Sequence, residues 1–188
     1  KGVEDLLKKE RTDPSGAKSA ISVFITPTDN PGYQVLTKER KLGHRTNDTC
    51  QVRFESMRVP STDLLGPEGR GLSITLGGLS LGRIGVAAQS VGGARQALRL
   101  SKQYAQERST FGKAIIEHQA VAFQLAEMAT DVEVGRQMYL HAATLHDEGL
   151  NSVAAASMAK LFASEMAERV ASRAIQTVSP EKQRVQPF

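Results

Sequence analysis

The side chains most capable of chemistry are gathered in one short segment, residues 107–113, which reads ERSTFGK. An arginine and two hydroxyls can hold phosphate oxygens, and an aromatic ring can cover a flat heterocycle. The same residues could instead end a helix, with Arg108 and Lys113 facing its C-terminal dipole and Phe111 filling the core. From the residues alone, both interpretations stay open.

Other reaction chemistries find little support in the sequence. His118 has no suitably ordered serine and aspartate to form a nucleophilic triad. His141 and His146 are five residues apart, whereas a helical zinc site needs a spacing of four. Cys50 is the only cysteine, and the glycine-rich loop at residues 66–71 lacks the spacing of a phosphate-binding loop. We therefore expect neither a metal site nor a catalytic triad.

Length and composition narrow the class of protein. The chain has 188 residues, with 24 Lys and Arg against 20 Asp and Glu, for a formal charge of +4. That charge permits an anionic ligand, but no basic run with interleaved aromatics indicates nucleic acid. No apolar stretch looks long enough to span a bilayer, and no signal-peptide pattern opens the chain. We expect a soluble, intracellular protein that is not secreted.

The residue pattern that predicts secondary structure around residues 107–113 changes near residue 66, from strands to helices. Before it, strands are expected at residues 20–26, 33–36 and 50–54, and they are too few for an independent sheet, so partner strands should be missing. After it, the hydrophobic period becomes helical, with helices expected at about residues 72–107, 117–148 and 152–178. The fold class is α+β, with part of a small antiparallel β-domain followed by an antiparallel helical bundle.

Apolar stripes and small residues predict how these helices pack. The two later helices carry the stripes Val121, Leu125, Met128 and Val132, and Met158, Leu161, Phe162, Met166 and Val170. Alanines between them favour close helix packing. The pairs Gly77–Gly78 and Gly92–Gly93 cost roughly 1 kcal/mol per glycine in a helix, which indicates close approach by a backbone or a ligand. Glu127, Asp131 and Glu133 are expected to form a solvated face with Arg136.

An ordered series of motifs resembles the acyl-CoA dehydrogenase family. It runs from RTDP at residues 11–14 through NPG at 30–32, LGHR at 42–45 and GRIG at 82–85. RSTFGK, EHQA, LAEMA, MAKLFA and AIQ continue it to Gln176. Residues 1–10 and 177–188 depart from the family pattern, which has a glycine pair after the position of Gln176.

The resemblance implies an N-terminal helical domain, a middle β-domain and a C-terminal four-helix bundle, usually assembled as a tetramer or dimer. Residues 1–66 would be part of the middle β-domain, and residues 67–188 an incomplete C-terminal bundle. The chain is then expected to be a truncated piece, inactive by itself, of a protein about twice as long.

The resemblance also implies site residues. Arg108 resembles an arginine that contacts the FAD pyrophosphate across a subunit boundary, with Thr110 and Phe111 beside it. Gln119 resembles a glutamine near the adenosine, and Gln176 one near the neighbouring flavin. Arg83 resembles an arginine lining the acyl-CoA site, and the alternative is a surface arginine of the helix.

The reaction that the resemblance implies is α,β-dehydrogenation of an acyl-CoA thioester in fatty acid metabolism. A carboxylate removes the α-proton while FAD accepts a hydride. One family position for that base lies beyond the end of this chain and the other is Gly82, so no catalytic residue is assigned. The alternatives are a non-catalytic helical interaction module, or an acyl-CoA oxidase or flavin monooxygenase of the same fold. The expected compartment is the bacterial cytoplasm or the mitochondrial matrix.

Overall fold

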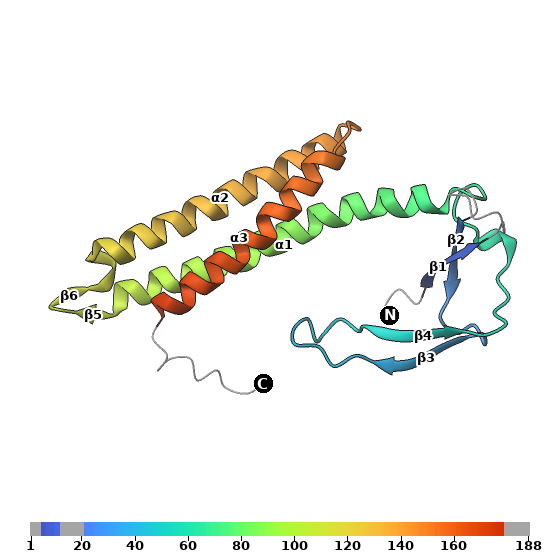
Figure 1. The fold of residues 1–188 in the computed structure, drawn as a ribbon, viewed down its shortest axis with the longest axis horizontal. Coiled ribbons are helices and arrows are strands. Elements are labelled where there is room, and N and C mark those ends of the chain that lie inside the picture. Colours follow the sequence, from blue (N-terminus) through green and yellow to red (C-terminus); the bar gives the residue numbers. More distant parts are fainter. Residues whose placement is uncertain (1–4, 12–20, 179–188) are drawn as a thin grey trace. The chain divides into compact units, whose positions relative to one another are not determined.

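A computed structural model describes residues 5–11 and 21–178 of the chain. The chain divides into two compact units, Lys1–Gly77 and Gly78–Phe188, and each is considered by itself. Figure 1 shows the strands of the first unit and the long helices of the second. The α+β class is confirmed, whereas the predicted domain boundary at residue 66 stays a prediction.

The first unit contains two separate antiparallel strand pairs. Strand β1 (Asp5–Arg11) pairs with β2 (Ile21–Pro27), and β3 (Tyr33–Lys38) pairs with β4 (Cys50–Phe54). The three strands predicted from alternation are confirmed within a few residues, and β1 is an additional strand. Two-stranded sheets are marginal by themselves, which agrees with the expectation that further strands belong here.

Strand β2 anchors the segment that leads into the first helix. The backbone N–H of Leu65 donates to the carbonyl of Val23 at 2.7 Å, and that of Gly69 donates to the buried hydroxyl of Ser22 at 2.9 Å. A Cβ built on Gly71 would lie 2.7 Å from the carbonyl oxygen of Ile21. Glycine is therefore required where the helix begins.

Three long helices follow, joined by a small hairpin and a tight turn. They are α1 (Gly71–Glu107), α2 (Gln119–Asp147) and α3 (Val153–Thr177). The hairpin consists of β5 (Ser109–Thr110) and β6 (Lys113–Ala114), and a 3-10 turn, η3 (Ile115–Glu117), leads from it into α2. The three predicted helices are confirmed, each within two residues at either end.

Small residues bring α2 and α3 together. Alanines 155, 156, 159 and 163 of α3 are buried, as are Met128 on α2 and Met166 on α3. The stripe predicted for α2 is confirmed, since three of its members are buried and Val121 packs against the core. The stripe predicted for α3 is wrong at Met158 and Leu161, which are exposed because the alanine face of the helix turns inward instead.

The glycines that permit close helix packing are not the ones that the sequence indicates. A Cβ on any of Gly77, Gly78, Gly92 or Gly93 would meet no described atom within 4 Å. A Cβ on Gly135 of α2 would lie 3.1 Å from both Met166 Cε and Val91 Cγ2. The described residues therefore supply a close neighbour at Gly135 and none at the paired glycines, where approach by a ligand or another chain stays a prediction.

Ion pairs also join α2 to α3. Arg173 Nη2 lies 2.8 Å from Glu127 Oε2, and Arg169 Nε lies 3.5 Å from Asp131 Oδ2. Of the three acidic residues expected to form a solvated face with Arg136, only Glu133 pairs with it, within α2 at 3.5 Å. Such partly exposed pairs contribute about 0–1 kcal/mol each, so their main effect is on helix register.

Helix α1 has the composition of a possible membrane span. One 18-residue window in it has a mean hydropathy of 1.3, and 17% of that window is buried. The expectation that no apolar stretch reaches the required length is therefore not met on length and composition alone. The leucine, isoleucine, valine and alanine residues of the helix account for this value.

The contrast between two glycines gives a test of the packing. We expect Gly135→Leu to lower the free energy of unfolding by about 1–3 kcal/mol, because the added side chain must displace Met166 and Val91. Gly92→Ala should raise it by up to about 1 kcal/mol, since alanine is the better helix former and the space beside Gly92 is open. Urea denaturation of both variants measures the difference, and equal stabilities would contradict the packing described.

Candidate functional site

The segment singled out in the sequence forms a tight hairpin between α1 and α2. The N–H of Arg108 still donates to the carbonyl of Tyr104 at 2.9 Å, so the helix ends there. Thr110 then pairs with Lys113 in the short β5–β6 ladder, and the N–H of Ile115 donates to the carbonyl of Arg108 at 2.8 Å. The hairpin therefore reverses the chain within two residues, Phe111 and Gly112.

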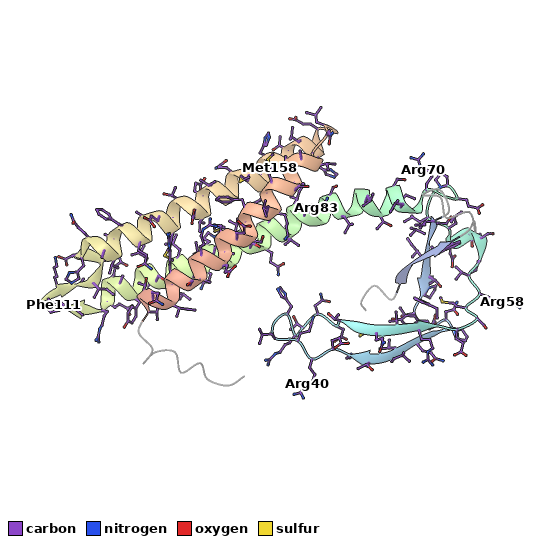
Figure 2. The ribbon with its side chains drawn as sticks, viewed as in Figure 1. Arg40, Arg58, Arg70, Arg83, Phe111 and Met158 are labelled. Atoms are coloured by element: carbon purple, nitrogen blue, oxygen red, sulfur yellow. The ribbon has the colours of Figure 1, made fainter. Side chains whose placement is uncertain are left out.

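Both turn residues have left-handed backbone conformations. The φ angle is 52° at Phe111 and 80° at Gly112. Glycine adopts this region freely, but a residue with a Cβ loses roughly 1–2 kcal/mol there. The Phe111 side chain is nonetheless 98% exposed. The interpretation in which Phe111 fills the core is wrong, and the hairpin instead holds an aromatic ring in solvent (Figure 2).

His118 fastens the hairpin to the start of α2. Its Nε2 lies 3.2 Å from the Thr110 hydroxyl and 3.3 Å from the Thr110 carbonyl oxygen. Its ring also meets Phe111 edge-on, at 6.2 Å between centroids and an interplanar angle of 85°. The carbonyl of His118 accepts the N–H groups of Val121 and Ala122, each at 3.0 Å, and so begins the helix.

Sequence reasoning considered His118 only as a member of a triad and therefore missed this role. His118 follows Thr110 by only eight residues, with a short turn between them, and this spacing could have indicated a contact between the two side chains. The contact nevertheless depends on the hairpin conformation, and the sequence does not specify that conformation.

The predicted flavin residues lie at one end of the helical unit. Arg108, Phe111 and Gln119 are exposed around the hairpin, and Thr110 is half-buried. Gln176 is exposed on the last turn of α3. The amide Nε2 of Gln124, near the start of α2, donates to the carbonyl of Arg173 at 3.0 Å. The end of α3 is thereby tied to the end of the unit that carries the hairpin.

Arg83 lies apart from this group. It lies on α1, 25 residues before Arg108, which directly follows the end of that helix. This spacing corresponds to roughly 37 Å at 1.5 Å per residue. Its side chain is half-buried, and Nη1 reaches the Ser80 hydroxyl at 3.5 Å. Figure 2 shows the separation between Arg83 and Phe111 along α1. The structure therefore brings together the predicted flavin residues but not the predicted substrate residue.

The Arg108 guanidinium is exposed at the hairpin. Within the described residues, no carboxylate lies within salt-bridge distance of the Arg108 guanidinium. The Lys113 ammonium donates to the carbonyl of Glu117 at 3.3 Å. An exposed guanidinium, a hydroxyl and a flat ring on one rigid turn can together hold a phosphate and cover an aromatic base.

Other chemistry is not supported by the described part of the chain. It contains no cluster of three or more histidine, cysteine or acidic side chains able to hold a metal ion. Gly82 is exposed and supplies no carboxylate next to Arg83.

Comparisons with known proteins identify the family of the chain. Residues 69–181 match the family described as the acyl-CoA dehydrogenase C-terminal domain. An acyl-CoA dehydrogenase of Bacillus subtilis is 44% identical over 165 residues, which cover 88% of this chain and 44% of that protein.

Solved structures show the same fold. Butyryl-CoA dehydrogenase from Megasphaera elsdenii superposes with a TM-score of 0.92 at 34% identity, over 96% of this chain and 47% of that one. A structure of PigA with FAD and proline gives a TM-score of 0.90 at 27% identity, over 96% of this chain and 47% of the other. The chain spans about half the length of the proteins it matches.

The strained turn predicts an unusual response to mutation. We expect Phe111→Asn to leave the free energy of unfolding unchanged, or to raise it by up to about 1 kcal/mol, because asparagine tolerates left-handed φ and little buried surface is lost. Gly112→Val should lower it by about 1–2 kcal/mol for the opposite reason. Urea denaturation measures both, and a large loss in Phe111→Asn would show that the ring contributes to packing.

Proposed function

The chain belongs to the acyl-CoA dehydrogenase family, and on that premise we propose that the whole protein carrying it performs FAD-dependent α,β-dehydrogenation of acyl-CoA thioesters. The chain itself contributes binding groups and no catalytic base. We further propose that the protein acts as a homo-oligomer, a dimer or tetramer, in the bacterial cytoplasm or the mitochondrial matrix.

The observation that carries the proposal is the exposed hairpin between α1 and α2. Arg108, Thr110 and Phe111 occupy consecutive or neighbouring positions on a turn whose conformation is fixed by its own ladder and by His118. A guanidinium forks two phosphate oxygens, and a ring in solvent gains from contact with a flat base. These side chains fit the pyrophosphate and adenosine portion of FAD.

The direction in which the site faces supports sharing of the cofactor between subunits. The Phe111 ring is exposed, as are Arg108 and Gln119, so their ligand must come from outside the helical unit. Gln176 lies at the same end of the unit. We propose that these residues hold the FAD of an adjoining protomer. When bound, FAD supplies the hydride acceptor of the reaction.

Arg83 lies far from the hairpin, so we assign it a different role from that of Arg108. At roughly 37 Å from the hairpin along α1, Arg83 would serve a different active site from the one that Arg108 serves. We propose that it contacts acyl-CoA. Gly82 beside it leaves the base position without a carboxylate, so the group that removes the α-proton must be supplied from elsewhere in the protein.

A second candidate function is favoured by the exposed apolar side chains of α1. Leu79, Leu81 and Val86 are 51%, 53% and 44% exposed. This much exposed apolar surface on one helix is typical of an interface, so the chain could also act as a non-catalytic oligomerisation module. An oxidase or monooxygenase of the same fold is a third candidate, and rapid reoxidation of the reduced flavin by oxygen would identify it.

Arg108 gives the direct test of the flavin site. Arg108→Ala in the whole protein should weaken FAD binding about 10- to 100-fold, the range for loss of a charge-assisted hydrogen bond. Arg99→Ala is the matched control, because Arg99 is also exposed on α1 and bonds only to Gln96, at 3.0 Å, among the contacts described. Flavin fluorescence titration measures the affinities, and equal FAD content in the two variants would overturn the assignment.

The isolated chain tests the interaction hypothesis. Residues 1–188 expressed alone should give a light-scattering mass above that of one chain, because the apolar side chains of α1 would find partners. Added phospholipid vesicles distinguish this from a membrane role for α1, since a protein interface should not co-sediment with them. A dilute, monodisperse monomer would contradict the expectation.

A further inference from the structure

His118 directs its ring nitrogen Nε2 at Thr110 of the hairpin. Its Nε2 faces two oxygen atoms of the same residue, the Thr110 hydroxyl at 3.2 Å and the Thr110 carbonyl at 3.3 Å. A carbonyl oxygen can only accept a hydrogen bond. A proton on Nε2 therefore satisfies both contacts, whereas an unprotonated Nε2 could accept only from the Thr110 hydroxyl.

The proton on Nε2 in turn fixes the direction of the Thr110 hydroxyl. The N–H is shared between the Thr110 carbonyl and hydroxyl oxygens, and the hydroxyl then acts as the acceptor in that contact. Its own proton is left for a different partner. Thr110 lies two residues after Arg108, on the short ladder that begins at Ser109, so that partner can be the same anion that the guanidinium binds.

We propose that His118 is a positioning residue that makes the Thr110 hydroxyl a donor to a phosphate group. The inference rests on the proposed function, since the phosphate is that of the dinucleotide assigned to the hairpin. His118 does not touch the reacting atoms and is not a catalytic residue.

The surroundings of His118 suit this role. Its backbone N–H donates to the carbonyl of Ile115 at 3.1 Å, and its backbone carbonyl accepts the N–H groups of Val121 and Ala122 in α2. The imidazole is therefore anchored to the end of a 29-residue helix. Its edge also lies against Phe111. One side chain thus orients both the hydroxyl and the ring of the hairpin.

The test compares FAD affinity among variants of the whole protein. His118→Leu and Thr110→Val should each weaken FAD binding about tenfold, the effect of losing one aligned donor to a charged group. The double variant should bind about as weakly as either single variant, because both substitutions remove the same hydrogen bond. His118→Gln retains an N–H donor and should stay within about threefold of the wild type, as should Thr110→Ser.

Two controls separate this role from a general loss of structure. His141→Leu removes an exposed histidine of α2 that is remote in sequence from the hairpin, and it should leave FAD affinity unchanged. Nitrogen-15 NMR of the imidazole in the unmutated, FAD-bound protein should show the proton on Nε2 of His118. This measurement needs no variant to fold.

The outcomes are distinct. Additive effects in the double variant, failure of His118→Gln to restore binding, or a proton on Nδ1 alone would each overturn the role of His118. If Arg108→Ala also leaves FAD binding intact, the proposed function itself fails. If Arg108→Ala weakens binding while His118→Leu and Thr110→Val do not, only the present inference fails.

Discussion

The close packing of α2 against α3 is the constraint on which the helical unit depends. Gly135 and the buried alanines of α3 allow the two helices to approach until Met166 fills the space beside the glycine. Closely packed protein interiors tolerate few changes in side-chain volume. The ion pairs of Arg169 and Arg173 also join the two helices. The end of α3 lies next to the start of α2, where Gln124 donates to the carbonyl of Arg173.

The hairpin is locally unfavourable and is held by its surroundings. Phe111 occupies a left-handed conformation that disfavours side chains, and its ring is in solvent, where an apolar group gains nothing. His118 and the β5–β6 ladder maintain this state. Strain of this kind persists where the surrounding structure over-determines the backbone, and it is often found at ligand sites. A bound flat ligand would give the exposed ring a partner.

The first part of α1 differs from the helix pair because its apolar side chains face outward. The window that meets the composition of a membrane span is mostly exposed within the described chain. A chain that covers less than half of its relatives leaves such surface without the segments that those relatives possess. Either a protein partner or a lipid bilayer would cover such apolar surface.

Much of the fold could be predicted from the sequence because it depends on local signals. The three helices follow from hydrophobic period, the glycine after α2 and the proline after α3, and β2, β3 and β4 follow from alternation. The ordered motifs identified the family, and with it the residues around Arg108, because side-chain types in fixed order are a property of the chain itself. The inward face of α3 was mispredicted, since Met158 and Leu161 are apolar but small residues pack more closely.

Only the tertiary structure decided which glycine lies between helices, which acidic residues pair with α3, and that His118 reaches Thr110. The sequence gives glycine, glutamate or histidine at a position, but the partner of each depends on distances between segments far apart in the chain or across a turn. The exposure of Phe111 is of the same kind. An aromatic residue predicts burial on average, and only the left-handed turn that carries this one reveals that it points away from the core.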